Sequence, residues 1–454
     1  MIARLGNMLS RLSRRLVPDP FVLALGLTGI VLACGWANLS LGDDCATGET
    51  IGTLLDGWFG GFANPGGLAF ALQMCLVLVT GHALALSPLI QRLVKKIARI
   101  PRTTAQAALV VAFVSCLAAI MHWGLGAIVG ALLAREITRD CQQRDIKLHY
   151  PLLGGAAYAG MAVWHGGLSG SAPLKVAEAG HFFEDAVGVV DVSRTLGSEL
   201  NLAVTGLMTI TIPLLFWALG RHKPDHPVQG PTGAFKPLPQ REAPEEKSFL
   251  NYLHYSSLIG TSLGILGLAG MVAAAILGIV KFDLNTVNLT FLFLGLVLHG
   301  GIRHYTAAVA DGARGAGAIV LQFPFYFAIL GVMQASGLIG LISEFFVNMS
   351  SQSSFPVLSF FSAGLVNLFV PSGGGQWAVQ GEILLRTGTN LGVDPSTTIM
   401  AFAYGDAWTN MLQPFWALPL LGIMGLRARD IIGYTAVVLF LMGVAIPALL
   451  LMLT

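Results

Sequence analysis

The sequence predicts an all-α polytopic membrane protein with inverted repeats, each containing a re-entrant helical hairpin and a broken transmembrane helix. Of its 454 residues, 54% are hydrophobic and only 11% are charged, and the mean hydropathy is +0.71. Apolar runs of about 20 residues, long enough to span a bilayer as a helix, recur along the chain. Glycine- and proline-rich stretches interrupt several runs. Such interruptions survive in a bilayer only where protein or a watery cavity covers the exposed backbone.

Charge and cysteine content argue against other classes of protein. The formal net charge of +2 is spread over the loops, so we expect no nucleic-acid partner. The five cysteines form no CxxC pair, which predicts neither a disulfide framework nor a metal site. We expect no cofactor beyond a coupling ion. The polar loops are too short for a catalytic domain, so the sequence predicts that the protein is not an enzyme.

Basic residues predict the orientation of the first helices. Four arginines precede the first apolar run, about 20–41, and an acidic loop without Lys or Arg follows it. Because cytoplasmic loops are enriched in Lys and Arg, the N-terminus is expected in the cytoplasm. The second run, about 66–90, returns to a loop that carries five basic residues. These basic residues are Arg92, Lys95, Lys96, Arg99 and Arg102.

The next apolar stretch, about 105–135, lies between two basic loops, so a single crossing would violate the charge rule. Its middle, Met121-His122-Trp123-Gly124-Leu125-Gly126, has the composition of a turn. Each leg of about 14 residues rises roughly 21 Å as a helix. We therefore predict a re-entrant hairpin from the cytoplasmic side. A helix at about 151–175, broken near 164–173, and a closing helix at 199–219 complete the first half, residues 1–220.

A proline-rich stretch, residues 221–250, is predicted to be a cytoplasmic linker. The second half, 251–454, begins with helices near 253–280 and 286–301, an interfacial helix at 302–317 and a span at 321–342. A hairpin at about 355–388, a broken helix at about 397–425 and a closing helix at 431–451 follow. The order matches that of the first half, and the second hairpin enters from outside. This pattern is typical of an inverted-topology repeat with its substrate site near the bilayer midplane.

The four breaks supply the candidate substrate site. At Val370-Pro371-Ser372-Gly373-Gly374-Gly375-Gln376-Trp377, proline removes a backbone donor and three glycines weaken the helix. Restarting half-helices present N–H groups to an anion, neutral side chains add donors, and tryptophans can wall an aliphatic tail. No Lys or Arg lies in a break, which suits a carrier that must release its anion. The candidate substrate-binding residues are Trp123, Gly124, Ser169, Gly170, Ser171, Ser372, Gly373, Gly374, Gly375, Gln376, Trp377, Trp408, Thr409, Asn410 and Gln413.

Ordinary structural roles compete with these assignments. Serines in membrane helices often bond only to the carbonyl four residues earlier, and tryptophans often belong to interfacial belts. Asp406 is the sharpest candidate because an ionisable group deep in an apolar helix usually has a function. With His122 and His165 it forms the predicted ion-coupling set, whereas a purely structural carboxylate–histidine pair is the alternative. Lys175 is expected to extend outward to the interface.

Several motifs resemble the bacterial short-chain fatty acid transporter family, within the wider ion-transporter superfamily, over nearly the whole chain. They are the 121–126 and 370–377 stretches, Gly167–Ser171, Ala403–Trp408 and Gln413–Pro419. The resemblance implies a multi-pass protein of the bacterial inner membrane that takes up small carboxylates such as acetoacetate or butyrate. It also implies a homodimer and an elevator-type motion. His122 and His165 depart from the family pattern, which has Asn and Gly there.

The coupling ion stays open at this stage between H+, Na+ and none, with proton symport preferred. A cation/H+ antiporter, or a Na+-coupled carboxylate carrier on the same fold, is the nearest alternative function. An antiporter typically needs two or more carboxylates in mid-membrane, and the sequence offers one convincing candidate, Asp406. A polytopic membrane enzyme is a more distant alternative.

Overall fold

The computed structural model describes residues 20–42, 47–178, 180–181, 183–221, 230, 248–280, 284–371, 373–413 and 416–454. Within these ranges every regular element is a helix. The first half contains α2 (Pro20–Gly42), α3 (Thr47–Phe62), α4 (Pro65–Ala85), α5 (Pro88–Ala98), α6 (Thr104–Met121), α7 (Trp123–Gln143), α8 (Tyr150–Tyr158), η1 (Ala159–Ala162), η2 (Trp164–Gly166), α9 (Ser171–Lys175), α10 (Glu184–Val187), η3 (Val192–Arg194) and α11 (Glu199–Gly220). The second half contains α12 (Phe249–Tyr255), α13 (Ser257–Ile276), α14 (Leu284–His299), α15 (Ile302–Ala313), α16 (Gly317–Ala335), α17 (Leu338–Asn348), α18 (Phe355–Phe369), α19 (Gly373–Asn390), α20 (Pro395–Thr409), η4 (Asn410–Leu412), α21 (Leu418–Met424) and α22 (Ala428–Leu453).

The helices have the length and composition of membrane spans. Among the described residues, four helices (α6, α11, α13 and α22) are each long and apolar enough to cross a bilayer. The number of candidate spans rises to six if each of two bent helix pairs is counted as one span. Three shorter apolar helices accompany them. The chain is therefore an all-helical polytopic membrane protein. The predicted cytoplasmic N-terminus and almost all of the 221–250 linker lie outside the described residues.

The prediction of an acidic loop after the first span is wrong over most of the length of that loop, because residues 47–62 form helix α3. Gly57 explains how this helix packs: a Cβ there would lie 2.8 Å from Ala335 Cβ and 2.9 Å from the Gly331 carbonyl oxygen. Glycine thus lets α3 approach α16 backbone to backbone, a contact that hydropathy does not reveal. The predicted span at 321–342 is also divided. A 75° bend separates α16 from α17, where Gly337 has φ +72°.

Each half contains one helical hairpin. In the first, a Cβ on Gly126 would meet Ala119, and the Ser115 hydroxyl donates to the Gly126 carbonyl (3.2 Å), so α6 and α7 pack antiparallel around His122. In the second, Gln376 Nε2 on α19 donates to the Ala363 carbonyl on α18 (2.8 Å). A helix that breaks into short pieces follows each hairpin: α8, η1, η2 and α9 in the first half, and α20, η4 and α21 in the second.

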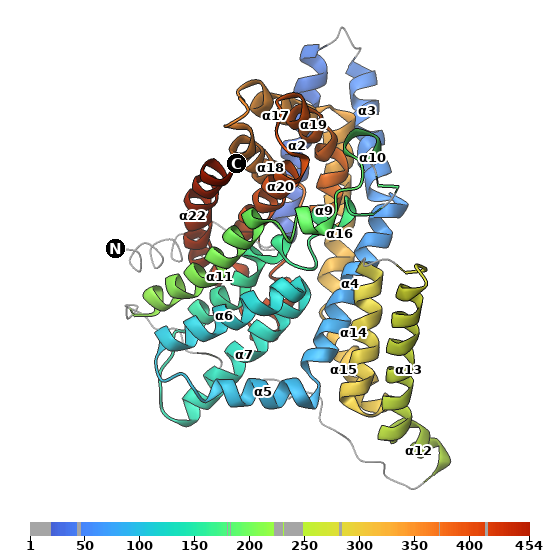
Figure 1. Ribbon diagram of the computed structural model, residues 1–454, viewed down its shortest axis with the longest axis vertical. Helices are drawn as coiled ribbons and strands as arrows, with labels where there is room; N and C mark the ends of the chain where they lie inside the picture. Colours follow the sequence, from blue (N-terminus) through green and yellow to red (C-terminus); the bar gives the residue numbers. More distant parts are fainter. Residues whose placement is uncertain are drawn as a thin grey trace.

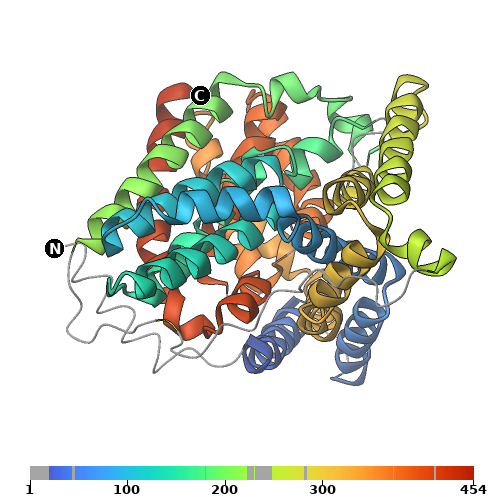
Figure 2. The same ribbon diagram turned by 90° about the horizontal axis from the view of Figure 1, so that it is seen from below.

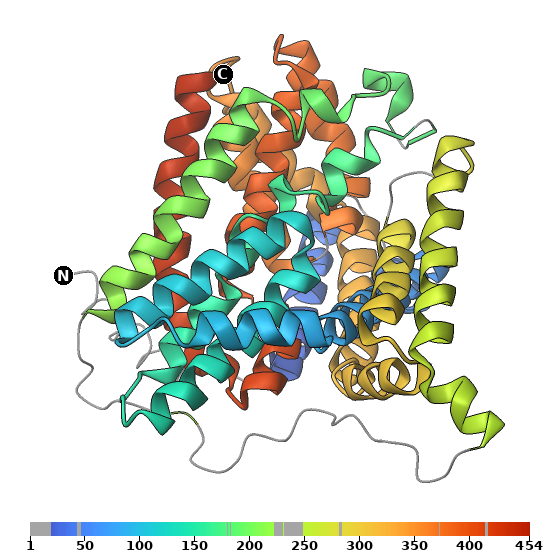
Figure 3. The ribbon, with the colours of Figure 1, turned by 60° about the horizontal axis from the view of Figure 1, so that its bottom comes forward.

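The helices form two groups that each draw on both halves of the sequence (Figures 1 and 2). The framework group contains α2–α4 and α13–α16. The hairpin group contains α6–α11 with its short helices, and α18–α22. Figure 3 shows α5 running from the framework group across to the hairpin group. In the second half, α17 connects α16 to α18 and so occupies the position that corresponds to α5 in the first half.

Candidate functional site

A cavity of about 710 Å³ lies between the two groups. The framework group contributes residues of α3, α4, α14 and α16, and the hairpin group contributes residues of α7, α9, α19 and the segments near them. Its volume lies within the range of small-molecule sites, and its lining is mostly apolar with a few polar groups. The cavity therefore brings together the tips of both hairpins and the first broken helix.

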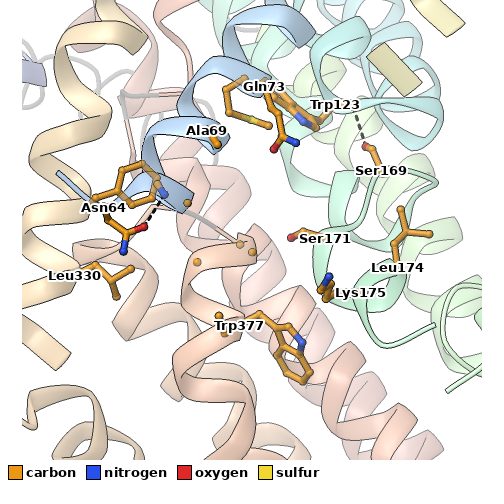
Figure 4. Close-up of a pocket in the computed structure, with 18 of the residues that line it drawn as sticks. Asn64, Ala69, Gln73, Trp123, Ser169, Ser171, Leu174, Lys175, Leu330 and Trp377 are labelled. Atoms are coloured by element: carbon orange, nitrogen blue, oxygen red, sulfur yellow. Dashed lines mark hydrogen bonds between the residues drawn. The ribbon is translucent and has the colours of Figure 1, made fainter. Parts of the chain in front are cut away.

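Seven of the residues predicted to bind substrate line this cavity (Figure 4). They are Trp123, Ser169, Ser171, Gly373, Gly374, Gly375 and Trp377. The Ser169 hydroxyl accepts a hydrogen bond from the Trp123 backbone N–H (3.1 Å), which joins the first broken helix to the first hairpin tip. The glycines place the beginning of α19, with its first backbone N–H groups, at the cavity.

The cavity also contains a cation, contrary to the expectation that Lys175 extends outward. Lys175 lines it, and its ammonium contacts Glu178 Oε2 at 2.8 Å. The residue follows the break by only two positions, and its helix has five residues. Helical periodicity does not predict where a side chain two positions past a break points, so the sequence did not indicate this contact.

Polar residues of the framework group are a second omission from the predicted site. Gln73 Nε2 donates to Asn285 Oδ1 (2.8 Å), which links α4 to α14 at the cavity. Asn64 caps α4 by accepting from the Gly67 N–H (2.8 Å), and Gln334 lies on α16. A polar side chain within an apolar helix, as at Gln73, was a usable signal.

Four tryptophans line the cavity. Trp123 and Trp416 meet edge to face with ring centroids 5.0 Å apart. Trp164 and Trp377 are 6% and 1% exposed, and within the described residues the indole N–H of each has no hydrogen-bond partner. A buried indole N–H usually finds a partner, so each of these two N–H groups is an unpaired donor inside the cavity wall among the described residues.

Directly behind Ser171 lies a buried histidine–carboxylate pair. Asp406 on α20 and His165 in η2 are 1% and 0% exposed, and Asp406 Oδ2 is 2.8 Å from His165 Nδ1. The other ring nitrogen, Nε2, is 3.1 Å from Ser171 Oγ. Neither Asp406 nor His165 lines the cavity, but Ser171 does, so the pair reaches it through one hydroxyl.

The remaining predicted residues lie away from the cavity lining and make contacts between helices. Thr409 Oγ1 donates to the Gly364 carbonyl (2.9 Å), and Asn367 Nδ2 donates to both Thr409 Oγ1 and Asn410 Oδ1 (2.9 Å each). Gln413 donates to the Asn367 carbonyl. These bonds join α20 to α18 where α20 breaks, whereas Asn367 Oδ1, Asn410 Nδ2 and Gln413 Oε1 have no hydrogen-bond partner among the described residues.

Hairpin and turn contacts account for the others. Gln376 donates to Ala363 and Gln380 within the second hairpin, and the Trp408 indole donates to the Leu439 carbonyl (2.8 Å). His122 caps α7: its Nδ1 accepts from the Gly124 N–H (3.2 Å).

Two predicted residues remain. A Cβ at Gly170 would overlap the His165 carbonyl oxygen, so glycine is required there for packing. Ser372 lies outside the described residues.

A multi-pass helical protein with a cavity between two helix groups, beside broken helices, has the architecture of a secondary transporter. A family model described as "Short chain fatty acid transporter" matches residues 1–453, and the chain belongs to this family.

Relatives described as "Putative short-chain fatty acid transporter" agree with the family assignment. The Escherichia coli (strain K12) protein is 37% identical over 446 residues, covering 98% of both chains. The Haemophilus influenzae protein is 36% identical over 442 residues, covering 96% of both. Among solved structures, the Alcanivorax borkumensis YdaH transporter shares 16% identity at a TM-score of 0.43, over 95% of this chain and 98% of that one.

Proposed function

We propose that this protein takes up short-chain fatty acids or related small monocarboxylates, the acetoacetate and butyrate class, and binds them in the cavity between the two groups. The observation that carries the proposal is the composition of the cavity. It combines the Lys175 ammonium, paired with the Glu178 carboxylate, two serine hydroxyls and the start of a long helix with tryptophan walls. An anion with a short apolar tail needs these two kinds of surface.

The carboxylate end is assigned to the region around Ser171, Lys175 and the start of α19. Lys175 supplies charge, Ser171 a hydroxyl, and α19 its first N–H groups with a positive dipole end. The aliphatic tail then packs against the rings of Trp123 and Trp416.

We propose that the two groups move relative to each other during transport, in an elevator-type cycle. Support comes from the location of the cavity between the groups and from the two connectors, α5 and α17, that occupy corresponding places in the halves. The same correspondence supports inverted repeats in which both hairpins are re-entrant, with halves 1–220 and 251–454 joined by the 221–250 linker. Rigid motion of one group would expose the cavity to each side in turn.

The proposed coupling ion is a proton, bound at Asp406 and His165. Both residues are buried, and Ser171 connects them to the cavity. Ionisable groups at such depth usually serve an ion pathway. His122 Nδ1 caps α7 by accepting from the Gly124 N–H. We therefore leave His122 out of the proposed coupling pair and use it as a control residue for that pair.

We further propose a homodimer in the bacterial inner membrane. The relatives are bacterial proteins, and α13 exposes most of its apolar surface, with 11% of its span window buried. Lipid or a second copy would cover that face. Mass measurement of the purified protein in lipid nanodiscs distinguishes one copy from two.

Uptake into proteoliposomes tests the proposed function. Purified protein is reconstituted, and the initial uptake rate of radiolabelled acetoacetate and butyrate is measured under an imposed pH gradient or Na+ gradient. Rates in protein-free vesicles are subtracted, because neutral acids leak through lipid. We expect saturable uptake driven by the pH gradient. Folded protein that transports neither acid, but exchanges Na+ for H+, would instead support the antiporter.

A further inference from the structure

The imidazole of His165 makes three polar contacts. Its Nδ1 lies 2.8 Å from Asp406 Oδ2, and its Nε2 lies 3.1 Å from Ser171 Oγ. The backbone N–H of Ala172 donates to the same Nε2 at 3.2 Å. The ring also stacks on Trp164, with centroids 4.3 Å apart and an interplanar angle of 22°.

The Ala172 contact assigns the tautomer. A backbone N–H can only donate, so Nε2 must present its lone pair, and the proton of a neutral ring is on Nδ1. Nδ1–H then donates to Asp406, which accepts as a carboxylate. The Ser171 hydroxyl, facing the same lone pair, donates to Nε2 as well. In this state its only proton points away from the cavity and is not available to a ligand.

We infer that His165 Nε2 is a proton-binding site that converts Ser171 into a donor for the substrate carboxylate, so that one proton binds with each carboxylate. This inference rests on the proposed function. When a proton from the cavity bonds to Nε2, the lone pair is consumed and the Ala172 N–H loses its acceptor. Nε2–H now donates to Ser171 Oγ, and the Ser171 hydroxyl turns its proton toward the cavity. The proton leaves a hydronium ion, which becomes water, and no other covalent bond is made or broken.

Charge balance favours joint binding of proton and anion. The imidazolium would lie between the Asp406 carboxylate and the substrate carboxylate, stacked on the Trp164 face, which attracts a cation. One proton added with one monoanion leaves the net charge of the cavity unchanged. The binding site crosses the low-dielectric membrane interior both loaded and empty. Because its net charge is the same in both states, neither crossing carries the cost of moving an unbalanced charge.

The other titratable groups on the surrounding elements are engaged elsewhere. On α20, the Tyr404 hydroxyl donates to Asn201 Oδ1 (3.0 Å). The Tyr158 hydroxyl donates to the Asn410 and Gln413 carbonyls (3.0 and 3.1 Å).

Two further titratable groups occupy α6 and α9. Cys116 on α6 contacts the Ala159 carbonyl (3.8 Å), and Lys175 on α9 contacts Glu178. Asp406 is therefore the charged group that is hydrogen-bonded to the His165 ring.

Proton uptake on binding tests the inference in the wild-type protein. Acetoacetate is titrated into purified protein by calorimetry in buffers of different ionisation enthalpy, at several pH values between about 6 and 8.5. Free carboxylates are fully ionised there, so a linked proton belongs to the protein. We expect uptake that approaches one proton per carboxylate bound. Binding without proton uptake at every pH overturns the inference and leaves the proposed function intact, whereas absence of binding counts against both.

Matched histidine variants locate the proton. His165→Gln retains an acceptor for Ala172 and a donor for Asp406 but does not titrate, and His122→Gln is the buried control. The measured quantity is the ratio of initial acetoacetate uptake with and without a pH gradient of one unit. We expect this ratio to fall to about one in His165→Gln, with acetoacetate exchange persisting at a raised KM, and to stay at the wild-type value in His122→Gln.

Two outcomes of the variant experiment would overturn the inference. One is a wild-type ratio in His165→Gln. The other is an equal loss of the ratio in both variants. If His165→Gln does not fold, the wild-type calorimetry decides alone.

Discussion

A single methyl group added at Gly373 should separate the cavity from the buried pair behind it. A Cβ there would lie 2.7 Å from Ser171 Oγ and 2.9 Å from His165 Cε1, well inside van der Waals contact. Ser171 must rotate away from His165, or the tip of the second hairpin must retreat. Overpacking of this kind costs about 1–3 kcal/mol. At about 1.4 kcal/mol per factor of ten, we expect uptake efficiency to fall roughly 5- to 100-fold in Gly373→Ala.

The neighbouring glycine provides the control. A Cβ at Gly374 would have its nearest neighbour, Ser171 Cβ, at an ordinary 3.8 Å, although the residue lines the same cavity at the same helix start. Gly374→Ala should therefore stay within about threefold of wild type, a difference of less than 1 kcal/mol. The assay is kcat/KM for acetoacetate uptake in proteoliposomes, with equal reconstitution checked by immunoblot. Equal losses in both variants would refute the argument, because they would show that flexibility or volume matters rather than the contact with Ser171 and His165.

Three other predictions follow from contacts within the hairpin group. Lys175→Met should raise the KM for acetoacetate about 10- to 100-fold, since a charge-assisted hydrogen bond contributes about 1.5–3 kcal/mol. Glu178→Gln should lower this KM, because it removes a carboxylate that competes with the substrate for Lys175. Gly405→Ala should destabilise the protein by about 1–3 kcal/mol, because the new Cβ overlaps the backbone of α18, whereas Gly206→Ala, with open space around it, should not. Asp394→Asn should lower the Tm slightly at pH 7 and by less at pH 3.

Distinct measurements separate these effects. Lys175→Arg keeps the charge and should retain a KM near that of wild type in the uptake assay; a KM unchanged by Lys175→Met would remove this residue from the site. Thermal unfolding in detergent compares Gly405→Ala with Gly206→Ala, and equal Tm values would contradict the close approach of α20 to α18.

The sign of the Asp394 prediction follows from its pKa. Burial alone would raise it, but hydrogen bonds from Ser396 and the guanidinium of Arg194, 2.7 Å away, outweigh burial and hold the pKa below its ordinary value of 3.8. A depressed pKa contributes stability above about pH 3.8 that is lost as the pH falls through the folded-state value. A Tm difference between wild type and Asp394→Asn that is as large at pH 3 as at pH 7 would contradict this explanation.

The helix breaks were predictable because their signal is local. Proline and glycine act on the backbone of their own turn, so the interruptions near 122, 164–173, 370–377 and 409–413 could be located from composition alone. Asp406 stood out for a comparable reason, since a charge in an apolar helix is conspicuous whatever surrounds it. Helix α3 was missed because two acidic residues and five glycines lower its apparent hydrophobicity. Two of these glycines, Gly57 and Gly61, are in fact the surface that packs on α16.

Sequence alone thus determined the membrane class, the family and the positions of the four breaks. Tertiary structure decided which side chains of each break reach the cavity. After a helix break, the helical period no longer predicts which way a side chain points. Its direction then depends on how the restarted segment packs. Packing turned Ser171 and Lys175 into the cavity, committed Thr409, Asn410 and Gln413 to helix contacts, and brought His165 against Asp406, 241 positions away.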